Sequence, residues 1–190
     1  DASRPDFVAL ARKARGLFFG GGDQIRITNA LLGTPVGDAI AAAFAEGAVV
    51  GGTSAGTACQ SEKMITGEGD FTQVRTRSVE LWQGLGFLPS DVVVDQHFLR
   101  RQRQNRLLSV VLEEPRLLGV GVDEETAIWV RPDGTFQVLG RSGVMVFDAQ
   151  GAPVSRQPQQ SGQDLLGVKD LKLHLLLPGA TYDLASRRPL

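Results

Sequence analysis

The segment Gly52-Thr53-Ser54-Ala55-Gly56 fits the G-x-S-x-G pattern of a serine nucleophile. The apolar run 47–50 precedes it, and the segment from Ala55 to Met64 is able to form a helix. A serine on such a strand-to-helix turn presents its hydroxyl clear of the backbone, because the flanking glycines lack Cβ atoms. The helix N-terminus adds free N–H groups beside the oxygen. The alternative is an ordinary glycine-rich turn in which Ser54 caps the helix.

One of the two histidines is placed to activate a serine. His97 follows the apolar run from Asp91 to Asp95, which predicts a buried strand. A serine hydroxyl needs a base to take its proton, and an imidazole is the natural base near neutral pH. His174 lies inside an alternating segment late in the chain, where a structural role is expected. We therefore predict that His97 is the base.

Three carboxylates, Asp123, Glu124 and Glu125, follow another apolar run, 118–122. A carboxylate would orient the imidazole and stabilise its charged form. Successive residues of an extended chain point to opposite sides, so either Glu124 or the pair Asp123 and Glu125 faces the site. In open α/β sheets, ligands bind at the carboxyl ends of strands, where all of these residues fall. The order serine, histidine, acid differs from that of α/β-hydrolases and argues against an ordinary esterase or lipase.

Two further segments favour ligand binding. Gly20-Gly21-Gly22 follows a short buried strand predicted over Leu17-Phe18-Phe19, so its N–H groups could approach a ligand closely; the alternative is a flexible turn. A helix predicted from Leu99 to Glu114 carries four arginines, and guanidinium groups bind carboxylates through paired hydrogen bonds. At a spacing of three residues, one face of this helix would hold Arg100, Arg103 and Arg106, with Arg101 off that face. The alternative is a solvated basic face.

Strands that alternate with helices predict an α/β fold with a mainly parallel, open sheet, in a single catalytic domain over residues 1–190. Further helices are predicted at Phe7–Arg15, Gln24–Leu32 and Asp38–Glu46. Further strands are predicted at Gly47–Thr53, Ala127–Val130, Thr135–Leu139, Val144–Asp148 and Leu171–Leu177. Pro132-Asp133-Gly134 indicates a hairpin turn, and loops are predicted at Gly67–Gln83 and Gln157–Gly167.

Composition narrows the functional classes. A net charge of −1 provides no general surface for nucleic acid, and no apolar run reaches membrane-spanning length. The single cysteine excludes an internal disulfide framework; it favours a reducing, cytoplasmic compartment and leaves secretion open. Two distant histidines and one cysteine lack the spacing of a metal site, so we expect neither a metal nor a cofactor.

Taken together, four motifs resemble those of the cyanophycinases, serine exopeptidases related to the aspartyl dipeptidases. They are Gly21-Gly22-Asp23-Gln24, the serine motif, Asp95-Gln96-His97-Phe98 with its following arginines, and the segment 121–127. The resemblance runs from about Leu17 to the C-terminus and implies a fold like that of class I glutamine amidotransferases. It also implies cleavage of cyanophycin, a poly-aspartate backbone with arginine on each side-chain carboxyl, into β-Asp-Arg dipeptides.

The resemblance assigns roles to particular residues. Ser54 would be the nucleophile, His97 the base and Glu124 the orienting acid. The oxyanion hole would use the backbone N–H of Ala55 and that of Gly22 or Gly21. The residues implied to line the substrate pocket are Gln24, Asp95, Gln96, Arg101, Arg103 and Arg106. The acidic residues open as partners of the substrate arginine are Asp23, Glu62, Glu68, Asp70 and Asp95.

Members of this family carry further strands before the Gly-Gly-Asp-Gln motif, and this chain has almost none. We expect those strands to exist as a separate cleaved N-terminal chain or as a segment outside this sequence, because their loss would expose a sheet edge. The resemblance also implies a homodimer. The alternatives are an aspartyl dipeptidase, another β-aspartyl peptide hydrolase, or a catalytically inactive relative.

Overall fold

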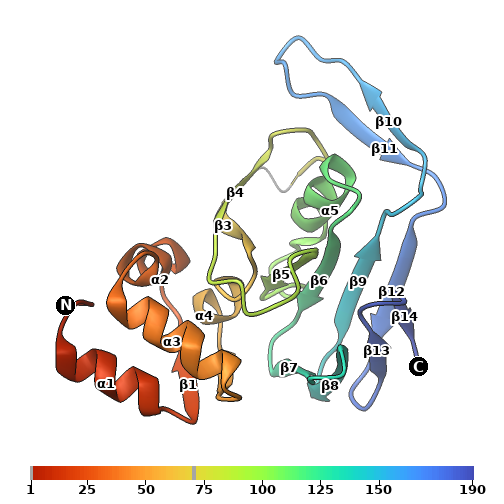
Figure 1. The fold of residues 1–190 in the computed structure, drawn as a ribbon. Coiled ribbons are helices and arrows are strands. Elements are labelled where there is room, and N and C mark those ends of the chain that lie inside the picture. The colour runs from red at the N-terminus through yellow and green to blue at the C-terminus, as the bar shows by residue number, and fades with distance from the viewer. Residues whose placement is uncertain (1, 70–71) are drawn as a thin grey trace. The chain divides into compact units, whose positions relative to one another are not determined.

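The computed structural model describes residues 2–69 and 72–190 (Figure 1). It divides into two compact units: unit 1 comprises residues 1–66 and 81–90, and unit 2 comprises residues 67–80 and 91–190. The chain passes between the units within β3 (Lys63–Gly69) and β4 (Val79–Gln83), which form a two-stranded sheet.

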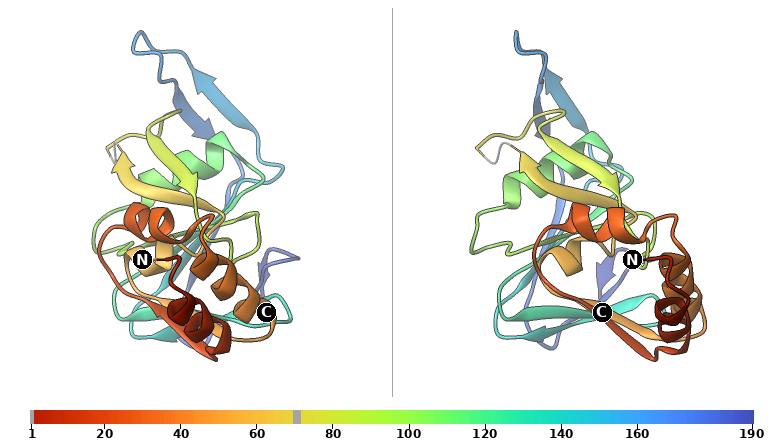
Figure 2. Two further views of the ribbon diagram at one scale, coloured as in Figure 1. Left: turned by 60° about the vertical axis from the view of Figure 1, so that its left-hand side comes forward. Right: turned by 90° about the vertical axis from the view of Figure 1, so that its left-hand side faces the viewer.

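Unit 1 combines a two-stranded parallel sheet with short helices. Its elements are α1 (Pro5–Lys13), β1 (Gly16–Phe19), α2 (Gln24–Leu31), α3 (Pro35–Ala45), β2 (Val49–Gly52) and α4 (Ala55–Ala58). β1 pairs with β2 from Gly16 opposite Val49 to Phe19 opposite Gly52. α1 packs against α3 (Figure 2). The parallel pairing brings the ends of both strands, and therefore the glycine loop and the serine motif, to one edge.

The helices α2 and α3 of unit 1 begin where their sequences provide caps. Asp23 accepts hydrogen bonds from the N–H groups of Ile25 and Arg26 at the start of α2. Thr34 caps α3, whose first residue is Pro35. The strand predicted over Leu17-Phe18-Phe19 is in the expected place, but the prediction that it is buried is wrong for Phe18, which is 72% exposed. In a two-stranded sheet, packing on one face leaves alternate side chains uncovered.

Unit 2 contains two four-stranded sheets and a hairpin. The order of the first sheet is β12-β9-β6-β5, in which only β5 and β6 are parallel, and the second is antiparallel with the order β14-β13-β8-β7. β10 and β11 form a hairpin that extends from the remainder of unit 2 (Figures 1 and 2). The elements are β5 (Val92–Gln96), α5 (Gln104–Glu113), β6 (Leu118–Val122), β7 (Thr126–Val130), β8 (Thr135–Gly140), β9 (Val144–Asp148), β10 (Val154–Gln157), β11 (Leu165–Val168), β12 (Lys172–Leu176), β13 (Thr181–Asp183) and β14 (Arg188–Pro189).

The α/β class is confirmed, and the two parallel pairs lie next to the motifs. The prediction of a mainly parallel sheet is wrong, because the other strand pairs among the described residues of unit 2 are antiparallel. β1 with β2 and β5 with β6 are the parallel pairs, whereas β9 and β12 extend the sheet of β5 and β6 in the antiparallel sense. β5 and β6 are buried along their whole length, as their apolar sequences predict. The predicted hairpin between β7 and β8 is also confirmed.

Three local predictions are wrong. The helix after Ser54 ends at Ala58 instead of Met64, because the carbonyl groups of Cys59 and Gln60 accept hydrogen bonds from the segment 85–88. The segment 67–83, predicted as a loop, contains the end of β3 and all of β4. The second predicted loop, 157–167, includes the end of β10 and the first part of β11, which pair with each other.

No single helix among the described residues is long and apolar enough to cross a membrane. α2 and α3 meet that criterion only as a pair, on length and composition, and they are bent by 96° relative to each other.

Candidate active site

Ser54 occupies a strained backbone conformation at the turn between β2 and α4. Its φ is 55° and its ψ is −116°, a combination that non-glycine residues rarely adopt and that costs about 1–3 kcal/mol. Ser54 stands at the N-cap position of α4, yet its side chain makes no capping hydrogen bond. The alternative interpretation of Ser54 as an ordinary helix cap is therefore wrong. A hydroxyl held on a strained turn and not used for capping is the geometry expected of a nucleophile.

The glycines around Ser54 allow the chain to approach itself closely. A Cβ at Gly56 would lie 2.0 Å from the carbonyl oxygen of Phe19, and a Cβ at Gly52 would lie 2.1 Å from the carbonyl oxygen of Gly56. Such contacts are too short for any side chain, so the turn requires glycine at both positions. Thr57 completes the turn by donating a hydrogen bond from its hydroxyl to the carbonyl oxygen of Gly52.

The glycine loop after β1 lies beside Ser54. A Cβ built at Gly21 would be 3.4 Å from the Ser54 Cβ and 3.8 Å from its hydroxyl oxygen. Gly22 has a φ of 134°, a conformation that favours glycine, and its surroundings are open. Ala55, whose N–H was predicted to stabilise an oxyanion, is 1% exposed as a residue. The loop and the first turn of α4 thus bring the predicted donors to the same region of unit 1.

Gln24 has protein partners of its own. Its side-chain nitrogen donates to the carbonyl oxygens of Ile65, at 2.9 Å, and Thr66, at 2.6 Å. The residue is buried, so these bonds satisfy both amide hydrogens and tie α2 to β3. The amide nitrogen of Gln24, a residue implied to line the substrate pocket, is thus bonded within unit 1.

His97 and Glu124 form a hydrogen-bonded pair at the ends of two neighbouring parallel strands. The His97 Nδ1 lies 2.5 Å from the Glu124 Oε1. A carboxylate can only accept, so Nδ1–H is the donor and Nε2 is left as the basic nitrogen of the ring. His97 has a φ of 53°, which re-aims the chain as soon as β5 ends. This is the base-and-acid geometry that orients an imidazole for proton transfer.

The carboxylates on either side of Glu124 have different partners. Asp123 binds backbone N–H groups of the turn after β5, and Glu125 lies 3.5 Å from Arg141 at the surface. Residues 123–125 follow the end of β6, and Glu125 has a φ of 49°, so the alternation expected from strand geometry does not apply to them; Glu124 is the carboxylate that bonds to the imidazole. The other histidine, His174, is partly buried on β12, where its ring makes an edge contact with Tyr182.

The predicted helix from Leu99 to Glu114 begins later than expected. Residues 98–102 form a turn, and α5 starts at Gln104. Asp123 binds the N–H groups of Leu99 and Arg100, and Gln102 has a φ of 53°, so the segment cannot continue as a helix. The prediction that Arg100, Arg103 and Arg106 share a helix face is therefore wrong.

The arginines instead divide by exposure. Arg100 and Arg101 are exposed on the turn, where Arg101 is accessible to an anionic ligand. Arg103 is nearly buried and donates from its guanidinium to the carbonyl oxygen of Gln96 at 2.7 Å. Burial, followed by the positive charge of Arg106, lowers the pKa of Arg103.

Arg106 and Asp95 form a buried ion pair within unit 2. The Arg106 Nε donates to the Asp95 Oδ2 at 2.9 Å, a second nitrogen of the same guanidinium binds the other carboxylate oxygen, and both residues are about 1% exposed or less. Each charge neutralises the other, and the paired hydrogen bonds give this ion pair a fixed geometry. Gln96, next to Asp95, is 8% exposed, and its side-chain oxygen has no hydrogen-bond partner among the described residues.

The acidic residues predicted as possible partners of a substrate arginine differ in exposure and in the partners they already have. Asp23 caps α2 and remains half exposed, and Glu62 is exposed. Asp95 is committed to Arg106. Asp70 and the side chain of Glu68 lie outside the described residues.

The predicted site residues belong to both units. Unit 1 contains Ser54, Ala55, Gly22 and Gln24, and unit 2 contains Asp95, Gln96, His97, Arg101, Arg103, Arg106 and Glu124. Within the described ranges, no group of three or more His, Cys, Asp or Glu side chains is arranged to hold a metal ion.

Sequence reasoning missed two supports of the His97 turn. One is the Asp123 carboxylate, and the other is the packing of the fully buried Phe98 ring over Gly121. The sequence signal for the second was available, since glycine inside a buried strand indicates a close approach. No local pattern indicates the first, because Asp123 is more than twenty residues from the turn that it binds.

Comparison with known proteins adds family information. The sequence profile of peptidase family S51 matches residues 4–138, which include the serine motif and the segment carrying Glu124. The chain is similar to the cyanophycinase of Synechococcus elongatus, with 37% identity over 189 residues, 99% of this chain and 58% of the relative. It is also similar to the cyanophycinase of Geminocystis herdmanii, with 34% identity over 186 residues, 97% of this chain and 68% of the relative.

A solved structure supports the fold. The crystal structure of a peptidase from an acI-B1 Actinobacterium resembles this chain with a TM-score of 0.67 at 24% sequence identity, covering 96% of this chain and 64% of that one. The fold of such peptidases is like that of class I glutamine amidotransferases, as predicted. The chain thus spans 58% of the length of the Synechococcus relative.

Proposed function

The chain belongs to peptidase family S51, and from this premise we propose that it carries the catalytic residues of a serine-type exopeptidase acting on cyanophycin. The observation that supports this most strongly is the hydrogen bond between His97 and Glu124, because it prepares an imidazole to act as a base. The similarity to two cyanophycinases supports the choice of substrate. Since the chain spans 58% of one of them, the activity is proposed for the whole protein that contains this chain.

The proposed reaction is acyl transfer to Ser54. The Nε2 of His97 takes the hydroxyl proton while the Ser54 oxygen attacks the scissile carbonyl carbon, and Glu124 stabilises the imidazolium that forms. The oxyanion is stabilised by the N–H groups of Ala55 and of Gly22 or Gly21. His97 then gives the proton to the leaving amine, and water, activated by the same base, hydrolyses the acyl-enzyme. β-Asp-Arg dipeptides are the proposed products.

Substrate recognition is proposed to rest on charge. The exposed guanidinium of Arg101 and the nearly buried guanidinium of Arg103 are the groups that we propose to receive the main-chain carboxylate of the polymer. For the arginine side chain of the substrate, Asp23 and Glu62 remain the proposed partners, because each has an accessible carboxylate. We propose that Gln24 and the ion pair of Asp95 with Arg106 have a supporting role in the substrate-binding region.

Two assembly proposals accompany the activity. We propose that the whole protein supplies the strands that precede the glycine loop in the family, either as a separate N-terminal chain or in one polypeptide. We also propose a homodimer. Intact mass, N-terminal sequencing and light scattering of the purified protein test both, and a monomer in solution would contradict the second.

The replacement Ser54→Ala tests the activity itself. We expect release of β-Asp-Arg from cyanophycin, followed by mass spectrometry, to fall by about 10³-fold or more, as for loss of other serine nucleophiles. Ser155→Ala, at an exposed serine on β10, is the matched control and should leave the rate unchanged. Retained activity in Ser54→Ala would remove this serine as the nucleophile. Turnover of aspartyl dipeptides without release from the polymer would instead favour an aspartyl dipeptidase.

A further inference from the structure

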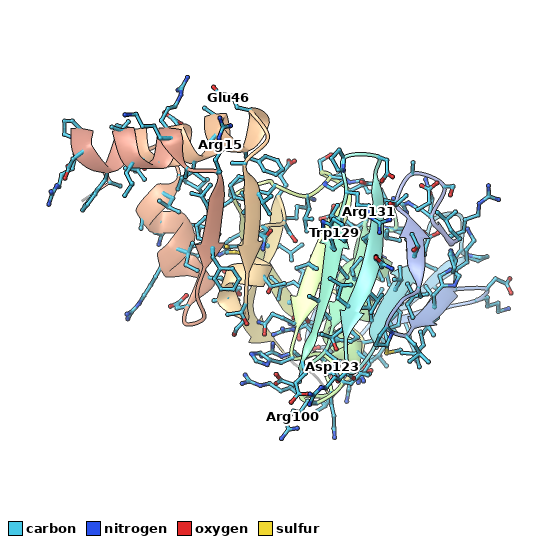
Figure 3. All side chains as sticks on the ribbon, turned by 90° about the horizontal axis from the view of Figure 1, so that it is seen from below. Arg15, Glu46, Arg100, Asp123, Trp129 and Arg131 are labelled. Atoms are coloured by element: carbon cyan, nitrogen blue, oxygen red, sulfur yellow. The ribbon has the colours of Figure 1, made fainter. Side chains whose placement is uncertain are left out.

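We propose that Asp123 is a positioning residue for His97, one whose carboxylate holds the turn after β5 in the conformation that brings the imidazole to Glu124. The catalytic part of this inference rests on the proposed function of His97 as the base. The geometric part concerns the hydrogen bond between His97 and Glu124 and stands independently of it. Figure 3 shows Asp123 and Arg100 at the same end of unit 2, with Trp129 and Arg131 towards the other end.

The Asp123 carboxylate joins three segments of unit 2. Its Oδ1 accepts hydrogen bonds from the N–H groups of Leu99 and Arg100, each at 3.0 Å. Its Oδ2 accepts a hydrogen bond of 2.7 Å from the hydroxyl of Ser142, on the turn between β8 and β9. The carboxylate thereby connects the end of β6 to the turn that follows β5 and to the turn that precedes β9. Ser142 fixes the carboxylate, and the carboxylate fixes the turn.

The turn needs an acceptor at this position. Its own carbonyl groups serve other donors: His97 accepts from the N–H of Arg101, and Leu99 accepts from the N–H of Gln102. Two positive φ values, 53° at both His97 and Gln102, prevent the segment from satisfying its N–H groups as a helix would. The donors at Leu99 and Arg100 are met by Asp123 in the way that a capping carboxylate meets the first N–H groups of a helix.

Asp123 and Glu124 are adjacent in the chain. The hydrogen bonds that fix the turn and the hydrogen bond that orients the imidazole therefore come from the same short segment. The backbone segment that presents the Glu124 carboxylate to His97 also presents Asp123 to the two residues after Phe98. A shift of the turn would therefore change the distance between the two members of the pair. Burial raises the pKa of Asp123, but hydrogen bonds from Ser142 and from the backbone outweigh it and leave the pKa lowered, so the carboxylate stays ionised near neutral pH.

Two variants separate the acceptor from the rest of the side chain. Asp123→Ala removes every hydrogen bond of the carboxylate, whereas Asp123→Asn keeps an oxygen for the two N–H groups and offers an N–H to the Ser142 hydroxyl. For Asp123→Ala we expect kcat on cyanophycin to fall by about 10²-fold, the effect of misplacing a catalytic group by about 1 Å. For Asp123→Asn we expect kcat within about tenfold of the parent, because a neutral acceptor forms a weaker bond in the same place.

A spectroscopic readout distinguishes positioning from a general loss of stability. The chain has only two histidines, so the downfield proton resonance of the His97 Nδ1–H, expected for its short bond to Glu124, can be assigned by its loss in His97→Gln. We expect Asp123→Ala to lose or broaden this resonance while the ring signals of His174 remain in place. Asp123→Asn should retain it. A variant that is merely less stable would keep the resonance at temperatures where it is folded.

The resonance measurements test the positioning role of Asp123 independently of the enzymatic activity. Unchanged His97 resonance in folded Asp123→Ala overturns the proposal, as does equal loss in Asp123→Asn. If Asp123→Ala does not fold, Ser142→Ala decides, since it removes one of the bonds to the carboxylate: a broadened His97 resonance supports the proposal, and an unchanged one overturns it. Absence of turnover in the parent protein would count against the proposed function and would leave the resonance comparison valid.

Discussion

The turn that carries Ser54 depends on glycines, which have no Cβ atom, whereas the turn that carries His97 is held by hydrogen bonds to a carboxylate. Around Ser54, Gly52 and Gly56 permit backbone contacts that no Cβ could share. Around His97, Asp123 supplies acceptors to two N–H groups of the turn. Both turns hold a residue at positive φ, 55° for Ser54 and 53° for His97. The same backbone strain is thus supported by steric fit in one place and by polar bonding in the other.

The difference predicts different sensitivities. A turn that depends on close backbone contact should tolerate no added atom, because backbone cannot move aside at low cost. A turn held by a carboxylate should tolerate changes in size better than loss of the acceptor. The following changes test that contrast, from the largest expected effect to the smallest.

The most severe change should be Gly56→Ala. Its Cβ would lie 2.0 Å from the carbonyl oxygen of Phe19, an atom of the neighbouring strand backbone. We expect the free energy of unfolding to fall by about 3 kcal/mol or more, as for strongly overpacked sites. Denaturant titration measures this, with Gly20→Ala as the control, because a Cβ at Gly20 meets nothing within 4 Å. Equal stability of the two variants would remove the steric argument.

A smaller effect is expected for Gly121→Ala, beneath the turn of His97. The added Cβ would lie 2.3 Å from the Phe98 ring, but a ring can shift where a backbone carbonyl cannot. We expect a loss of about 1–3 kcal/mol in the free energy of unfolding and a weaker His97 resonance, since Phe98 adjoins the base. A loss greater than that of Gly56→Ala would reverse the proposed order of sensitivities.

Lowering the pH should have the smallest and most selective effect, because it protonates the Asp123 carboxylate. The pKa of Asp123 is lowered from its ordinary value of 3.8, so its contribution to stability is present above that value and is lost as the pH falls through the lower pKa of the folded state. We expect the amides of Leu99 and Arg100 to lose protection from hydrogen exchange below about pH 4. The amides of Thr57 and Ala58, which bond to the Ser54 carbonyl, should keep theirs. Simultaneous loss at both turns would contradict the contrast.

Sequence patterns identified the candidate catalytic residues because these residues lie at strand ends. β5 and β6 are buried throughout, so their apolar runs are unambiguous, and polar residues were predicted directly after them. The pattern indicated His97 and left the three carboxylates 123–125 open, and the choice of Glu124 came from the family resemblance. The start of α5 could not be predicted, because Asp123, distant in sequence, binds the N–H groups that would otherwise have begun the helix earlier. The length of α4 was predicted wrongly for the same reason, since N–H groups of the segment 85–88 donate hydrogen bonds to the carbonyl groups of Cys59 and Gln60. Non-local hydrogen bonds leave no local pattern.

The state of Cys59 has a practical consequence for labelling chemistry. It is the only thiol in the sequence; it is fully buried, donates to the carbonyl oxygen of Gly56, and burial raises its pKa to about 12. The thiolate is the reactive form, so this cysteine is protected from alkylating reagents at neutral pH in the folded protein. A cysteine introduced at the exposed position of Arg101 would therefore take up a fluorophore or spin label selectively, without prior removal of the native thiol.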